Sequence, residues 1–340
     1  MIVTIPNSLS PASILAFAAE LDELPPADLY EFDFGRGRWF PPFSMLLLAI
    51  ILKRFRDARP DCRCRARNHE NHTYAAHLGF FRSFGLQHGN APGAAPGSDN
   101  YVPITALAVE EIRREAADRW IEVGDVIEGK ARELAGVLTR TDQGALFDTL
   151  SYSIREIIRN TVEHSEAPEL LICAQYWPSR NEVEVGIADA GIGIMNSLRR
   201  NPSFAELDER QAVQTALMPG VSGNPLAGTG SDVWQNSGYG LYMTNRICRS
   251  GGKFMICSGH AGIQLTATNK TDLEGNLPGT AIRLLINTNR LTDLREQLQR
   301  FHEEGRRAAQ TIRGANRNFA STASQMLSVD FQSDQIDDDF

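Results

Sequence analysis

The sequence lacks the features that would place the protein in a membrane, outside the cell or on nucleic acid. Its longest apolar run, Met45 to Leu52, is far shorter than the roughly 20 residues that span a bilayer. The N-terminus has neither the basic start nor the long apolar stretch of a signal peptide. A formal net charge of −8 argues against non-specific binding to nucleic acid. We therefore expect a cytoplasmic protein.

Cysteine is scarce, and its five positions do not suggest a disulfide or zinc framework. Their number is odd, and Cys62 and Cys64 are too close for the usual zinc-ligand spacing. Unpaired thiols fit a reducing compartment. The basic stretch from Lys53 to Arg67 has no interleaved platform of aromatic residues. We interpret it as a solvated helix end and loop rather than a phosphate-binding track.

What is present is the composition of an ordinary globular protein, with 340 residues, 42% of them hydrophobic and 22% charged. The length allows two domains or one large one. Short strand and helix patterns alternate at the start of the chain and predict a first α/β domain. A stretch rich in Gly, Ala and Pro, Gly89 to Ser98, is the best linker. The expected divisions are an α/β domain at 1–100, a connecting segment at 101–135, a second domain at 136–290, and an amphipathic helix with an acidic, disordered tail at 291–340.

Periodicity and turn residues predict the individual elements. In the first domain we expect strands at Ile2–Ile5, Leu29–Phe34 and Cys62–Arg67, and helices at Pro11–Leu21 (capped by Ser10), Phe43–Phe55 and Thr73–Phe84. A further strand is expected at Tyr101–Leu107. In the second domain we expect a helix at Leu146–Ser165, an antiparallel strand pair at Leu170–Trp177 and Glu182–Asp189, a helix at Leu241–Arg249 and a strand at Ala281–Asn287.

The predicted helix from Leu146 carries a carboxylate and a carboxamide on one face. Glu156 and Asn160 are four residues apart, so their side chains lie on the same side. Such a pair can hold a water with one group and a hydrated Mg²⁺ with the other. Alone, such a pair is more often the solvated face of an amphipathic helix than a binding site. His164, one turn further on, stays unassigned.

A second motif follows the strand that ends at Asp189. Gly191 and Gly193 let the backbone turn tightly there and allow a flat ring to approach the main chain. A carboxylate at the floor of a pocket accepts a hydrogen bond from an exocyclic amine, which favours adenine over guanine. Alone, a Gly-x-Gly after a strand is usually only a turn.

A third motif is a long loop from Met218 to Gly240 that contains six glycines and runs into a helix. Loops of this length are lids or flexible insertions. Its end presents backbone amides near a helix N-terminus, which suits phosphate groups. The residues there are Ser237, Gly238, Tyr239, Gly240 and Leu241. A fourth, weaker signal is Thr280, whose hydroxyl opens the last strand and is within reach of a bound base.

Taken in order, these motifs resemble those of the GHKL superfamily, the ATP-binding (Bergerat-fold) domains of gyrase, heat-shock chaperones, histidine kinases and MutL-type proteins. The resemblance covers Leu146 to Asn287. It implies an α/β sandwich in which ATP lies under a lid. By this resemblance Asn160 binds Mg²⁺, Asp189 contacts the adenine amine, and Glu156 is the catalytic base in members that hydrolyse ATP. Gly191, Gly193, Ser237, Gly238, Tyr239, Gly240, Leu241 and Thr280 complete the nucleotide site.

Other nucleotide-binding motifs are absent: there is no P-loop, no dinucleotide fingerprint and no eukaryotic protein-kinase set. Residues 1–100 resemble the STAS-type domains that partner GHKL serine kinases in bacterial anti-sigma systems. Ser44 lies near the position at which those domains are phosphorylated, but the usual Asp-Ser-Ser pattern is missing, so we interpret Ser44 as a helix N-cap.

These resemblances lead to one expected function and two alternatives. We expect a Mg²⁺-dependent ATP-binding protein that hydrolyses ATP slowly and regulates an unidentified protein partner through lid closure. Hydrolysis is expected to be slow because no second domain of the gyrase type, which supplies a lysine to the γ-phosphate, follows Asn287; a second copy in a homodimer is one way to complete the site. The alternatives are a serine/threonine kinase of the anti-sigma kind and a non-catalytic binding module that ATP switches.

Overall fold

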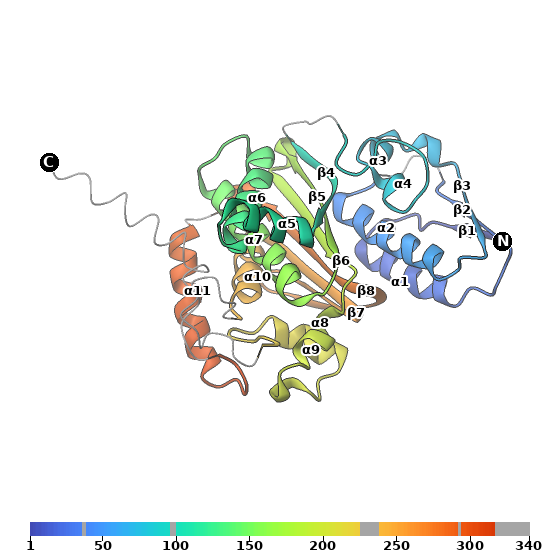
Figure 1. Cartoon of the computed structure of the whole chain (residues 1–340). Helices are drawn as coiled ribbons and strands as arrows, with labels where there is room; N and C mark the ends of the chain where they lie inside the picture. Colours follow the sequence, from blue (N-terminus) through green and yellow to red (C-terminus); the bar gives the residue numbers. More distant parts are fainter. Residues whose placement is uncertain (36–38, 96–99, 225–237, 292–293, 317–340) are drawn as a thin grey trace.

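The computed structural model describes residues 1–35, 39–95, 100–224, 238–291 and 294–316 of the chain (Figure 1). The fold is mixed α/β, as expected, with a three-stranded parallel sheet and a five-stranded antiparallel sheet. Within the described ranges no helix is long and apolar enough to cross a bilayer.

The N-terminal part forms the parallel sheet, with helices as the crossover connections between strands. Ser10 accepts a hydrogen bond from the Ser13 amide, which confirms the predicted cap of the first helix. The single helix expected at Thr73–Phe84 is wrong, because Gly79 adopts a left-handed φ of +85° and divides it into two short helices. The elements are β1 (Ile2–Thr4), α1 (Pro11–Asp22), β2 (Leu29–Asp33), α2 (Pro42–Asp57), β3 (Arg63–Arg67), a 3₁₀ turn (His69–Asn71), α3 (Thr73–His77) and α4 (Phe80–Ser83).

The antiparallel sheet has the strand order β4-β5-β6-β8-β7. The predicted hairpin between its second and third strands is confirmed, with Asn181 in the left-handed region at the turn. The last strand begins much earlier than the expected Ala281 and forms a long hairpin with the strand before it. The bounds are β4 (Tyr101–Ala108), β5 (Glu169–Trp177), β6 (Glu182–Asp189), β7 (Gly252–Leu265) and β8 (Lys270–Asn287).

Helices cover both faces of this sheet (Figure 1). On one face the main helices are α6 and α7, with α10 beside them; on the other face α1 and α2 lie between the two sheets. The remaining helices are α5 (Val109–Arg119), α6 (Val123–Thr139), α7 (Ala145–His164), α8 (Gly193–Leu198), α9 (Glu209–Ala216), α10 (Gly240–Gly251) and α11 (Leu294–Ala309), with 3₁₀ turns at Pro178–Arg180, Pro202–Phe204 and Thr288–Arg290.

The N-terminal part and the antiparallel sheet share one hydrophobic core, in which Phe43 and Leu46 of α2 cluster with Cys173 and Ala281 of the sheet. Close contact is possible because β6 has Gly186 at this point, where a Cβ atom would lie 2.9 Å from the Cα atom of Phe43. The segment 1–100 is therefore packed on the second sheet rather than joined to it only by a linker.

A polar contact fixes the start of α2 at the same interface. The Phe43 amide donates to the carboxylate of Glu184, 3.0 Å away on β6, and Arg283 donates to the other oxygen of that carboxylate. Glu184 thus satisfies one of the free amides of a helix whose own N-cap residue, Pro41, makes no side-chain cap. The N-cap role expected for Ser44 is wrong: it lies inside the first turn, is buried, and its hydroxyl donates to the Leu9 carbonyl.

Candidate functional site

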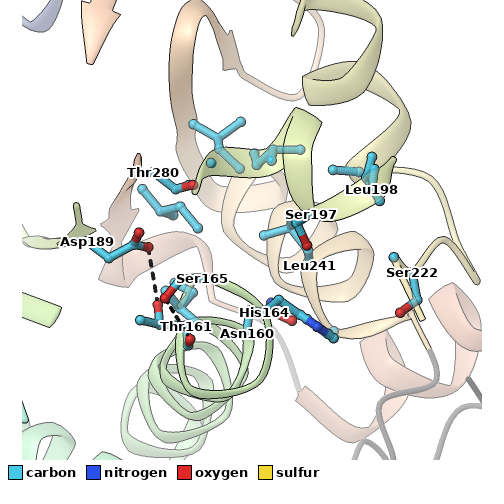
Figure 2. A pocket seen from close by; sticks show the side chains of 18 of the residues that line it. Asn160, Thr161, His164, Ser165, Asp189, Ser197, Leu198, Ser222, Leu241 and Thr280 are labelled. Carbon is cyan, nitrogen blue, oxygen red and sulfur yellow. Dashed lines mark hydrogen bonds between the residues drawn. The ribbon is translucent and has the colours of Figure 1, made fainter. Parts of the chain in front are cut away.

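A cavity lies between α7, the adjoining ends of β6 and β8, α8 and the start of α10 (Figure 2). It encloses about 810 Å³ of space free of atoms, counting the solvent at its mouth. Figure 2 shows Asp189 and Thr280 on one side, and Leu198 and Ser222 on the other. Most of the residues predicted from the sequence line this cavity: Asn160, Asp189, Gly193, Gly238, Gly240, Leu241 and Thr280.

Helix α7 supplies one wall. Its residues Asn160, Thr161, His164 and Ser165 face the cavity, because positions three and four apart share a side of a helix. Further along the same helix, Leu150, Ile154 and Ile158 pack in the core. The helix is buried along most of its length, so the alternative that it presents a solvated face at Glu156 is wrong.

Asp189 occupies the end of β6, opposite Thr280 of β8 in the strand register. One carboxylate oxygen accepts from the Gly191 amide at 2.9 Å, and the other faces the Thr161 hydroxyl at 3.5 Å. Burial raises the pKa of Asp189 from 3.8 to about 6, against the hydrogen bonds from Gly191, Thr280 and Thr161, which lower it. The side chain is therefore ionised at neutral pH, and burial of this charge lowers the stability of the folded protein.

Glycines shape the turn after Asp189 for reasons of internal packing. A Cβ atom on Gly191 would lie 2.1 Å from the Ser165 carbonyl oxygen, and one on Gly279 would lie 2.1 Å from the Asp189 carbonyl oxygen. Gly193 has a φ of +77° and lines the cavity, whereas Gly191 does not line it. Gly191 thus holds Asp189 in place by letting the chain pass close to α7.

His164 contributes an uncharged imidazole to the cavity. Burial, with smaller contributions from repulsion by the nearby guanidinium groups of Arg159 and Arg200, lowers its pKa to about 4. At neutral pH the ring is thus neutral and hydrogen-bonds without adding charge.

Glu156, predicted as the catalytic base, does not line the cavity. It is fully buried, and its two carboxylate oxygens accept from Arg155 at 2.9 Å and from Arg159 at 3.0 Å. Its carboxylate underlies the first residue of α10, since a Cβ atom on Gly240 would lie 2.0 Å from Glu156 Oε2. In this arrangement Glu156 is an ion-pair partner, close to the cavity wall but not exposed to it.

The end of the glycine-rich loop is only partly described. Gly238, Gly240 and Leu241 line the cavity, but Tyr239 is buried behind them among Tyr242 and α11. Ser237, the bulk of the predicted lid and the expected tail lie in 225–237 and 317–340, outside the described residues.

The sequence did not indicate several polar residues that line the cavity or support its wall, Thr161 and Ser165 among the former and Ser258 among the latter. Ser258 on β7 accepts from the Ile194 amide and donates to the Gly279 carbonyl, so it joins α8 to the turn before Thr280. Thr161 and Ser165 are four residues apart, and Thr161 is three residues before His164, so this helical spacing was a usable signal. No sequence signal indicated Ser258, because its position depends on the pairing of β7 with β8, which no local pattern shows.

The donor set for a metal ion is sparse. Within the described ranges no cluster of three or more His, Cys, Asp or Glu side chains could hold a cation. The carboxamide of Asn160 lines the cavity and is a suitable oxygen ligand for Mg²⁺. Mg²⁺ usually keeps several waters and takes its remaining ligands from phosphates. The single carboxamide of Asn160 therefore fits a Mg²⁺ ion that arrives with a nucleotide.

Comparison with protein-family models, curated proteins and solved structures finds no match to this chain.

Proposed function

We propose that this chain binds ATP together with Mg²⁺ at the cavity in the GHKL manner, and that the bound nucleotide regulates a protein partner. The observation that carries the proposal is the convergence of distant motifs on one cavity. Asn160, Asp189, Gly240 and Thr280 come from separate segments, and all of them line it.

The proposed orientation follows from the chemistry of the lining. The base would lie among apolar residues such as Ile187, Ile256 and Ile282, with Asp189 at its polar edge. An ionised carboxylate accepts from the 6-amino group of adenine but meets the carbonyl oxygen of guanine, so ATP is preferred to GTP. The phosphates would approach the amides at Gly238 and Gly240, where α10 begins, and Asn160 would hold the Mg²⁺ that offsets their charge.

Slow hydrolysis is part of the proposal, with Glu156 as the base. The ion pairs of Glu156 with Arg155 and Arg159 occupy both oxygens that a water would need. The same observation favours a second candidate, in which ATP is only a switch ligand and Glu156 is structural. For the kinase alternative, buried Ser44 is not an accessible target in its own chain, and the proposed acceptor is a serine or threonine of a partner.

Calorimetry with ATP, GTP and Mg²⁺, followed by incubation with γ-labelled ATP, tests these proposals. We expect binding of Mg-ATP, much weaker binding of GTP and slow release of free phosphate. Bound ATP with no product supports the switch, and a labelled partner serine supports the kinase. No binding of ATP at any Mg²⁺ concentration would overturn the proposed function.

A further inference from the structure

The C-terminal segment 294–316, consisting of α11 and the turn after it, packs against the outside of the cavity wall. In Figure 1 α11 runs beside α10. Its large buried apolar side chains are Leu294, Leu298 and Phe301. They form one hydrophobic cluster with residues of α7, of α10 and of the position before α10: Tyr152, Tyr239, Tyr242, Met243 and Ile247.

Polar contacts fix this packing. The Tyr242 hydroxyl donates to the Phe301 carbonyl. Arg246 of α10 forms an ion pair with Glu304 and places its guanidinium 4.6 Å from the centre of the Phe301 ring. The segment is therefore held by apolar, charged and hydrogen-bond contacts along α10.

The same segment also contacts both ends of the glycine-rich loop. The Gly220 amide donates to the Gly238 carbonyl at 3.1 Å, so the residues flanking 225–237 are tied together. The Asn316 amide donates to the Gly220 carbonyl at 2.6 Å and thus attaches the segment to that junction.

The turn after α11 supports cavity-lining residues from behind. Ile312 and Ala315 pack in a small cluster with Leu198, Phe204 and Val221. Two members of that cluster, Leu198 and Val221, line the cavity on their other side. One continuous segment thus backs the cavity wall at α8, at the loop ends and at the start of α10.

We propose that segment 294–316 is a strap that controls nucleotide exchange at this cavity. The inference rests on the proposed function. With the strap seated, Gly238, Gly240 and Val221 keep the positions in which they contact nucleotide. With it displaced, those contacts loosen and nucleotide leaves faster. Because coupling between sites is reciprocal, bound nucleotide must also tighten the strap.

Gly305 offers a way to displace the strap without altering a cavity residue. A Cβ atom there would lie 2.8 Å from Tyr242 Cε1 and 3.3 Å from Tyr239 Cε1. Gly305→Leu therefore wedges α11 away from α10. Leucine is a better helix former than glycine, so the change does not weaken the helix itself. Arg307→Leu places the same side chain on the exposed side of the helix and is the matched control.

The experiment measures release of a fluorescent N-methylanthraniloyl-ATP with Mg²⁺ from the full chain, together with hydrogen exchange in 294–316. We expect Gly305→Leu to release nucleotide about five- to tenfold faster, at the lower end of measured couplings between sites, with Arg307→Leu unchanged. Wild-type hydrogen exchange in the strap should slow when nucleotide binds. Tyr242→Ala removes the nearest clash together with part of the strap's own packing, so release should already be faster in that background and Gly305→Leu should speed it little further.

The outcomes separate the two proposals. If wild type binds no nucleotide, the proposed function and the strap both fail. If wild type binds, and Gly305→Leu raises hydrogen exchange in 294–316 without changing release, the strap alone is overturned. Should Gly305→Leu fail to fold, Gly305→Ala adds only the Cβ atom; unchanged release together with raised exchange in 294–316 would overturn the strap in that variant as well.

Discussion

Replacing Asp189 with asparagine should remove ATP binding and at the same time stabilise the folded protein at neutral pH. The carboxylate is almost fully buried, and burial raises its pKa to about 6. Asparagine has nearly the same shape and carries no charge. Its oxygen still accepts from the Gly191 amide, and its amide group can donate to the Thr161 hydroxyl, which can reverse its role.

The sign and size of the stability change follow from the pKa. The folded chain binds the Asp189 proton more tightly than an unfolded chain, whose carboxyl has the ordinary value of 3.8. Between these values the folded state holds more protons, so the free energy of unfolding falls as pH rises and stays lowered above pH 6. The difference corresponds to about 3 kcal/mol at most. In the variant the hydrogen bonds from Thr161 and Thr280 are weaker, which offsets part of this difference. We therefore expect the free energy of unfolding of Asp189→Asn to exceed that of wild type by about 1–2 kcal/mol.

Chemical denaturation at pH 5 and pH 7.5, with calorimetry for ATP, measures both effects. The increase in the free energy of unfolding of Asp189→Asn over wild type should be larger at pH 7.5 than at pH 5. Exposed Asp118, changed to asparagine, is the control and should alter neither stability nor binding. ATP affinity equal to wild type would refute the assignment of Asp189 to the adenine. A variant less stable than wild type at pH 7.5 would refute the reasoning about burial.

The sequence predicts those parts of the fold in which the pattern is local. The hairpin of β5 and β6 was readable because β6 alternates at Val183, Val185 and Ile187 and the intervening turn carries Pro178 and Asn181. The early start of β8 could not be predicted from the sequence, because Pro278 and Gly279 look like the beginning of a strand. They lie within β8, close to the point where its pairing with β7 shifts register.

The candidate site was predictable in its residues but not in their surroundings. Helical spacing brings Glu156 and Asn160 to one side of α7, yet it does not show that Arg155 and Arg159 close over the carboxylate. The contact of Glu184 with α2 joins residues 141 positions apart. Such contacts depend on tertiary packing, which leaves no periodic trace in the sequence.

Three further predictions concern the turn at Gly191, pH and hydrolysis. Gly191→Ala should lower the melting temperature and the ATP affinity, because its Cβ atom would meet the Ser165 carbonyl. The control is Gly129→Ala, which lies in open space on α6 and should stabilise the protein slightly. Equal melting temperatures of the two variants would contradict the close approach at Gly191. Wild-type ATP affinity should fall as pH drops through about 6, because protonated Asp189 no longer accepts from the amine, and calorimetry at pH 5 and 7.5 measures it. Glu156 is best replaced by glutamine, because Glu156→Ala would remove the carboxylate that lies between two buried guanidinium groups. If Glu156 is the base, Glu156→Gln keeps ATP binding and releases free phosphate about 10²-fold more slowly. Arg159→Gln should release phosphate faster than wild type, because it frees one oxygen of the Glu156 carboxylate to hold a water. Phosphate release that is the same in wild type, Glu156→Gln and Arg159→Gln would show that Glu156 only binds its arginines and is not the base, whereas bound ATP with no phosphate release from any of the three would leave ATP as a switch ligand.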